Sequence, residues 1–220
     1  MCTLTLWRFS AKIFSETYLK VRQMKKDKNK TFSLICIATL ISAFIYGLVL
    51  PFCWGNDPLS ETGTLSLLCE HRQGFFWVWG ILTCGSIALN TEYMYKKFLY
   101  KNKFFDVLCI MSVVSVCLVA LTLDHSIADW NPKRIAHWVA TGMYIVFTLA
   151  PIALFFIVNI KKYKNFGILL AVTFVIFGTF VFIFAVIGKS ALMEMVPLAL
   201  MEIYLFIINF TPVIKVQKLS

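Results

Sequence analysis

The chain has 220 residues, of which 60% are hydrophobic, 16% aromatic and only 15% charged. A soluble domain is about half apolar and about a quarter charged, so this composition is typical of a chain that faces lipid and excludes a disordered one. The formal net charge of +10 would suit a nucleic-acid partner. However, the basic residues form short clusters between apolar runs and no recognition motif is present, so we expect no nucleic-acid binding.

The chain begins with a basic segment, residues 1–30, that we expect to lie in the cytoplasm. Apolar residues mix with Arg8, Lys12 and Lys20 over the first 23 positions, a pattern that suits an amphipathic helix lying on the membrane. The alternative is a misread start upstream of Met24, which begins MKKDKNK, a typical flank of a first transmembrane helix. A cleaved signal peptide fits less well, because no A-x-A site follows the apolar run.

Residues 31–216 are predicted to form one transmembrane domain, an all-α bundle of six helices. A helix needs about 20 apolar residues to cross the bilayer core, and six runs reach that length. Each run is too long for a strand and lacks strand alternation, and a helix satisfies its own backbone polar groups in lipid. The predicted helices cover residues 32–52, 75–95, 104–123, 135–160, 166–188 and 195–214.

Lysine and arginine residues predict the orientation of the helices. Of 21 such residues, 17 fall on one predicted side, in the N-terminal segment, the loops after the second and fourth helices, and the tail. The opposite side carries four, which are Arg72, Lys133, Arg134 and Lys189. By the positive-inside rule both termini are cytoplasmic, so we expect a multi-pass protein of the cell membrane.

The longest external stretch lies between the first and second helices and contains Cys53 and Cys69. Outside the cell, where conditions are oxidising, these two residues can form a disulfide. The alternative is two free thiols near the membrane interface. The cysteines inside apolar runs are expected to act as small hydrophobic residues, and they are Cys36, Cys84, Cys109 and Cys117.

Glu202 is the sharpest functional candidate, because ionisable groups inside a membrane are costly and often functional. It lies about two turns into the sixth predicted helix, roughly 10 Å from the outer end. The functional interpretation is a carboxylate that binds a proton or a lipid headgroup. The alternative is a structural hydrogen bond to a neighbouring helix.

A second candidate group lies where the third and fourth helices meet the outer surface. The short connection brings Asp124, His125 and His137 to one membrane surface, where imidazole and carboxylate can share a proton, bind a cation or polarise a headgroup. The alternative is interface anchoring, beside Trp130 and Trp138. No metal site is predicted, since no HxxxH spacing occurs, and no motif for a catalytic residue or a cofactor is present.

Other polar and small residues indicate helix packing. Asn90 is predicted to hydrogen-bond a neighbouring helix, and Glu92 and Asp106 to form salt bridges with Lys96 or Lys103. Pro151 and Pro197 predict kinks. The small residues that predict close helix approach are Gly80, Gly85, Ser86, Ala88, Gly167 and Gly178.

The chain resembles the DUF998 family in four features. These are six helices with both ends inside, Asp124 at the end of the third helix, His137 at the start of the fourth and Glu202 in the last. That family is distantly similar to the Frag1/DRAM/Sfk1 family. The resemblance covers the chain from about Thr31 and rests on single residues. Because those eukaryotic relatives act in lipid and lipid-anchor handling, it implies a lipid-facing role rather than a particular reaction.

The predicted function is recognition of a lipid headgroup or another small polar ligand in the outer-leaflet half of the bundle. The residues proposed to bind it are Asp124, His125, His137 and Glu202. Membrane lipids are the expected partners, and no oligomeric state is predicted. Three alternatives stay open, which are a proton-coupled small-solute transporter, a membrane-embedded enzyme that modifies lipids, and a structural membrane subunit.

Overall fold

The computed structural model describes residues 29–55, 59, 65, 69, 72–122, 132–163, 165–183 and 190–211. This part of the chain is helical and contains no β-strand. An N-terminal helix, Asn29–Cys53, ends in the 3-10 helix η1 (Leu50–Gly55). It is followed by α3 (Gln73–Lys97), α4 (Phe105–Leu121), α5 (Pro132–Asn159), α6 (Phe166–Phe182) and α7 (Ala191–Phe210).

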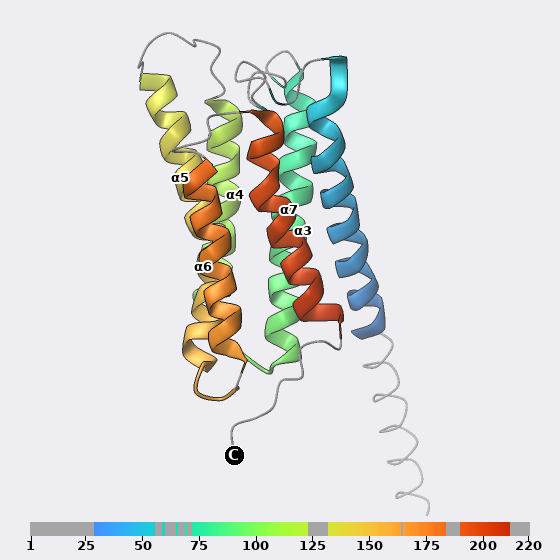
Figure 1. The fold of residues 1–220 in the computed structure, drawn as a ribbon, viewed down its shortest axis with the longest axis vertical. Coiled ribbons are helices and arrows are strands. Elements are labelled where there is room, and N and C mark those ends of the chain that lie inside the picture. Colours follow the sequence, from blue (N-terminus) through green and yellow to red (C-terminus); the bar gives the residue numbers. More distant parts are fainter. Residues whose placement is uncertain are drawn as a thin grey trace, which may run out of the picture.

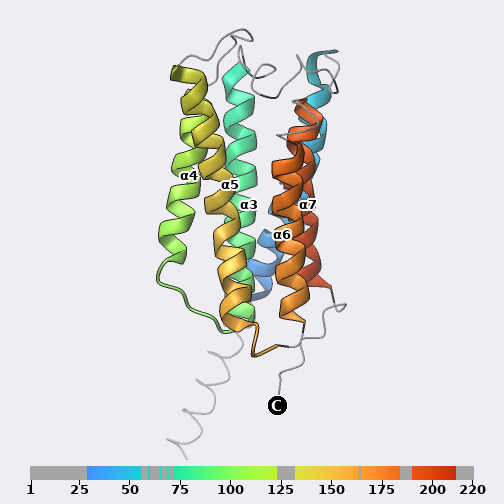
Figure 2. The ribbon, with the colours of Figure 1, turned by 60° about the vertical axis from the view of Figure 1, so that its left-hand side comes forward.

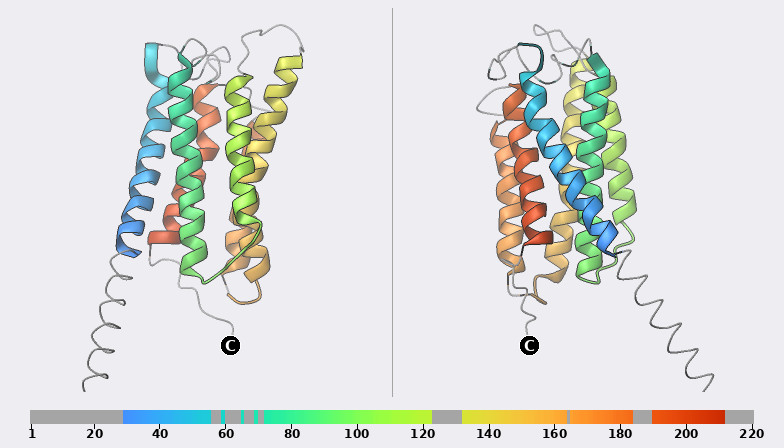
Figure 3. Two further views of the ribbon diagram at one scale, coloured as in Figure 1. Left: turned by 180° about the vertical axis from the view of Figure 1, so that it is seen from behind. Right: turned by 90° about the vertical axis from the view of Figure 1, so that its right-hand side faces the viewer.

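The helices stand side by side in an upright bundle, and consecutive helices run in opposite directions (Figures 1, 2 and 3). One end of the bundle, which we call the basic end, holds the start of the N-terminal helix at Asn29, the end of α3 at Lys97 and the start of α6 at Phe166. Helix α5 packs against α4 and α6, and α3 packs against α7. The contact between α3 and α7, which are distant in sequence, therefore closes the bundle.

Four helices are long and apolar enough to cross a membrane, namely the N-terminal helix, α3, α5 and α7. Helices α4 and α6 are apolar as well but have 17 residues each. Large apolar side chains face outward around the bundle, including Ile81, Ile110, Ile168 and Val175, each more than 60% exposed. A soluble protein rarely leaves so large an apolar surface uncovered, and this surface is that of a membrane protein.

Each predicted helix coincides with an observed one, although the boundaries move. The boundary shift that matters for the functional site is at the start of α7. This helix begins at Ala191 rather than at residue 195. The Ser190 hydroxyl accepts a hydrogen bond of 3.3 Å from the Met193 amide, and such a cap fixes the helix start. The amphipathic helix predicted within residues 1–23 lies outside the described residues.

Close packing is confirmed at one of the predicted glycines and is wrong at two others. A Cβ atom at Gly80 would lie 2.8 Å from Cγ1 of Val116, so α3 and α4 approach closely there. Gly85 and Gly178 have no neighbouring atom within 4 Å of that position. Their small size therefore does not serve contact between the described helices.

An aromatic cluster fills the core at the basic end. Phe155 of α5 contacts the rings of Tyr95, Phe98 and Phe166, at 5.3–5.5 Å between ring centroids. The Tyr95 hydroxyl also donates a 2.7 Å hydrogen bond to the carbonyl of Pro151. Helix α5 continues across that proline, and this cluster fixes α3, α5 and α6 relative to one another.

Candidate functional site

Glu202 lies in the middle of α7, and only 4% of its surface is exposed. At about 1.5 Å per residue it is ~16 Å along the helix from Ala191, deeper than the roughly 10 Å predicted. The difference arises because α7 begins earlier than the apolar run suggests. None of the described lysines and arginines forms a salt bridge with Glu202, so its carboxyl is buried at mid-depth without a cationic partner from these residues.

Tyr144 of α5 is the polar residue that the structure brings towards Glu202. Its side chain is 5% exposed, and its hydroxyl faces the Cys84 thiol on α3 and the Thr148 hydroxyl on α5, without full hydrogen-bond geometry to either. Glu202 acts on the same hydroxyl as a nearby charge. Ionisable groups buried inside a membrane are costly and often functional, so the Glu202 carboxyl beside this hydroxyl marks a candidate site.

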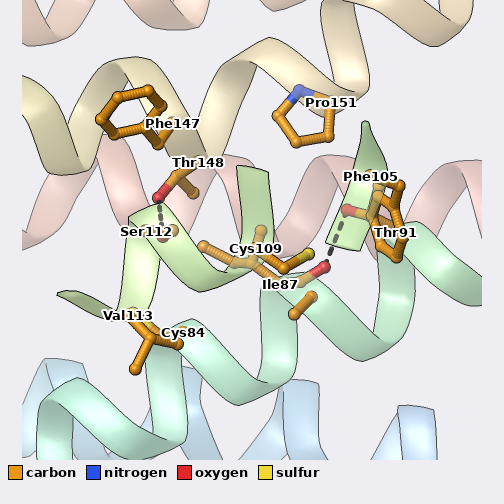
Figure 4. Close-up of a pocket in the computed structure, with 11 residues that line it drawn as sticks. Cys84, Ile87, Thr91, Phe105, Cys109, Ser112, Val113, Phe147, Thr148 and Pro151 are labelled. Atoms are coloured by element: carbon orange, nitrogen blue, oxygen red, sulfur yellow. Dashed lines mark hydrogen bonds between the residues drawn. The ribbon is translucent and has the colours of Figure 1, made fainter. Parts of the chain in front are cut away.

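A small, mostly apolar cavity lies between α3, α4 and α5, and neither Glu202 nor Tyr144 is among its lining residues (Figure 4). Its wall includes Ser112 and Thr148, whose hydroxyls are 2.8 Å apart and join α4 to α5. Cys84, Thr91 and Cys109 add further polar atoms to an otherwise apolar lining. The cavity has a volume of about 20 Å³, and a water molecule needs about 10–15 Å³.

A second polar network lies nearer the basic end and is structural. The Asn90 side-chain amide donates to the carbonyls of Cys36 at 3.1 Å and Ser86 at 2.9 Å. The Asn209 amide donates to the Asn90 carbonyl at 2.9 Å. These bonds join the N-terminal helix, α3 and α7, which confirms the predicted role of Asn90 between helices. The predicted ion pair between Glu92 and Lys96 is also present, at 2.6 Å.

His137 belongs to a different layer of the bundle from Glu202. It is half-buried near the start of α5, and its Nδ1 lies 3.4 Å from the hydroxyl of Thr122 at the end of α4. Tyr144, the α5 residue near Glu202, is two turns deeper, or about 10 Å along the helix. Asp124 and His125 lie outside the described residues, so the predicted grouping of these two residues with His137 stays a prediction.

Cys53 and Cys69 are not joined in the structure, and the predicted choice between a disulfide and two free thiols stays a prediction. Burial raises the pKa of the Cys69 thiol to about 12, with smaller contributions from Cys53 and Glu194. Since the thiolate is the reactive form, Cys69 is poorly suited to rapid oxidation. Glu194 also accepts a 3.0 Å hydrogen bond from the Leu65 amide, which joins the connection between the N-terminal helix and α3 to α7.

Sequence reasoning identified Glu202 by its charge and missed the neutral residues around it. Tyr144 and Thr148 are one turn apart, so they share a face of α5. Ser112 and Cys84 face them from α4 and α3. A search for hydroxyl-bearing residues at helical spacing within the apolar runs would have found the pair on α5, whereas the partners on other helices needed the fold.

Within the described residues no group of three or more His, Cys, Asp or Glu side chains could hold a metal ion. No protein-family model, curated protein or solved structure matches this chain. The resemblance to the DUF998 family therefore stays a prediction.

Proposed function

We propose that this protein crosses a cell membrane six times and binds a small polar ligand at the buried carboxyl of Glu202. The observation that carries the proposal is a buried carboxyl in the middle of α7 that has no salt bridge to a described residue and lies near the buried hydroxyl of Tyr144. An uncompensated carboxylate inside a membrane is costly, and such residues commonly serve binding or transport.

The chemistry of the pair defines the class of ligand. A carboxylate accepts hydrogen bonds and attracts positive charge, and the Tyr144 hydroxyl can donate or accept a hydrogen bond. An ammonium group or another hydrogen-bond donor would therefore satisfy Glu202 and Tyr144 together. A lipid headgroup at the membrane surface fits less well, because Glu202 lies about 16 Å along α7 from its start.

Native mass spectrometry of the purified protein tests this proposal. We expect a small co-purified adduct on the wild type that is lost in Glu202→Gln and weakened in Tyr144→Phe. The matched control is Glu92→Gln, which removes a half-exposed carboxyl at the basic end of α3. If no variant differs from the wild type in adducts, and Glu202→Gln is as stable as the wild type, the cluster serves helix packing and the proposal fails.

Proton-coupled transport is a second candidate, and the depth of Glu202 favours it. Carriers commonly bind substrate and coupling ion near the middle of the bilayer. Proteoliposomes that hold a pH-sensitive dye would measure proton entry on addition of a candidate solute. Proton entry in the wild type but not in Glu202→Gln would support transport over binding alone.

The predicted lipid-facing role, which the DUF998 resemblance implies, belongs to this proposal as well. The apolar outer surface of the helices supports it, since lipid chains must cover that surface. An enzymatic role would need a reacting group beside the acid. Glu202 and Tyr144 alone do not supply a nucleophile and base pair of the usual kind.

A further inference from the structure

The turn between α3 and α4, residues 98–104, holds a residue in an unfavourable conformation at the basic end. Leu99 has a φ angle of 54°, in the left-handed region that favours glycine. Its side chain is 93% exposed, the highest value among the large apolar residues described. The fold does not require a leucine at this position, because glycine adopts this φ angle at lower cost.

Hydrogen bonds on both sides hold this conformation in place. The Tyr100 amide bonds the Tyr95 carbonyl at 2.9 Å, and the Leu99 amide bonds the Lys96 carbonyl at 3.2 Å. This is the pattern that closes many helices, usually with glycine at the position of Leu99. The Asn102 side chain then accepts a 2.9 Å bond from the Phe104 amide, which leads into α4.

The neighbours of Leu99 show why its side chain points outward. Phe98 packs against Phe155 and Phe166, and Tyr100 packs against Tyr95 and Phe155, all in the aromatic cluster. With both flanking rings turned into the core, Leu99 must project away from it. Phe104, 70% exposed at the other end of the turn, projects as well.

Positive charge surrounds these two apolar side chains. Lys101 and Lys103 are exposed and form no salt bridge with any described residue. Lys97 is engaged with carbonyls of α7 and Lys96 with Glu92. Asp106, also exposed, is the nearest acidic residue along the chain, so the turn combines two exposed apolar groups with two lysines available for an anion.

We propose that this turn binds an anionic phospholipid of the leaflet at the basic end. Leu99 and Phe104 enter the boundary of the acyl chains, and Lys101 and Lys103 contact the phosphate. Cytoplasmic leaflets are negatively charged and attract such lysines, each by about 1 kcal/mol. Contact of Leu99 with lipid would offset its unfavourable backbone conformation, which a glycine would avoid.

The test is a native mass spectrometry titration of the full-length protein in detergent, with dioleoylphosphatidylglycerol as the anionic probe and dioleoylphosphatidylcholine as the neutral one. We expect the wild type to prefer the anionic lipid. K101Q/K103Q should weaken that binding by about five-fold for each lysine. The control K133Q/R134Q, at the opposite end of the bundle, should leave it unchanged.

Leu99→Gly distinguishes contact of Leu99 with lipid from a structural role of Leu99, because the two roles predict opposite changes in the thermal unfolding midpoint. Glycine relieves the backbone, so the thermal unfolding midpoint without lipid should rise, while anionic lipid binding falls. Leu99→Ala, which keeps the Cβ, should lose lipid binding without that rise in the midpoint. Unchanged lipid binding in both Leu99 variants, equal binding of the two lipids, or equal loss in K133Q/R134Q would overturn the proposal.

Discussion

Gly80 leaves room for a neighbouring helix where any larger residue would collide. The Cβ of an alanine would lie 2.8 Å from Cγ1 of Val116, a stiff β-branched side chain that is 4% exposed. Overpacking of this kind costs about 1–3 kcal/mol, which exceeds the ~0.5–1 kcal/mol that alanine gains over glycine in a helix. We therefore predict that Gly80→Ala destabilises the protein by about 1 kcal/mol in thermal unfolding.

Gly85→Ala is the matched control, one and a half turns further along α3. No atom lies within 4 Å of a Cβ at Gly85, so alanine should stabilise the protein by about 0.5–1 kcal/mol. Opposite signs for the two substitutions would establish the contact of Gly80 with α4. A loss of stability in both would mean that the two glycines serve helix flexibility instead.

The sequence alone does not show which of several residues of the same type contacts another helix or belongs to the site. Gly80 and Gly85 lie in the same predicted helix, but only the first closely approaches another helix. Glu202 was identified because a charged residue in an apolar run is rare whatever surrounds it. Tyr144 was not, because a tyrosine in a transmembrane helix is common and only the fold shows that it is buried near Glu202.

Lys97 joins the end of α3 to the end of α7. Its Nζ donates hydrogen bonds of 2.9 Å to the carbonyls of Ile208 and Asn209, in the last turn of α7. A cation at a helix C-terminus is stabilising, and hydrogen bonds from charged donors add to that effect. We predict that Lys97→Met, which keeps the apolar stem, lowers the free energy of unfolding by about 1 kcal/mol.

The control for Lys97 is Lys101→Met, measured without added lipid. Lys101 is exposed and has no salt bridge within the described residues, so its loss should change stability by less than about 0.5 kcal/mol. Chemical unfolding in detergent would measure both variants. Equal effects would mean that general loss of charge, and not the contact with α7, accounts for the result.

Helix positions were predictable because bilayer thickness sets the length of an apolar run. The ends of the helices were less predictable, because local hydrogen bonds determine where each helix begins and ends. The Ser190 cap moves the start of α7 towards the N-terminus, and that shift alone places Glu202 deeper than the sequence predicted. Contacts between distant helices, such as Asn90 with Asn209, depend on which faces meet, and a single sequence does not determine that.

The bundle as a whole separates its polar groups by depth. The Glu202, Tyr144 and Ser112–Thr148 groups lie in the middle, the asparagine network lies nearer the basic end, and His137 with Thr122 lies near the opposite end. Charge patterning predicted the two ends of the bundle, because lysine and arginine respond to membrane sides. The middle layer consists mostly of neutral residues, which carry no such signal.

The number of membrane crossings is the last prediction, and the termini cannot test it. If only the four longest helices crossed, the N- and C-termini would still share one side, as they do with six crossings. The difference appears at Lys133, in the first turn of α5, and at Lys162, just after the helix ends. With six crossings Lys133 is external and Lys162 cytoplasmic, because α4 has crossed before α5 begins. With four crossings these two positions exchange sides.

We predict six crossings, because α4 starts at the basic end after the short turn of residues 98–104 and returns beside α3 and α5 to the opposite end (Figure 3). At 17 residues, α4 and α6 are at the lower limit of about 17–25 residues for a membrane helix. Reporters fused after Lys133 and Lys162 test this directly. Alkaline phosphatase, active only outside, should be active at Lys133, and green fluorescent protein should fluoresce at Lys162. The reverse pattern would mean that α4 and α6 do not cross.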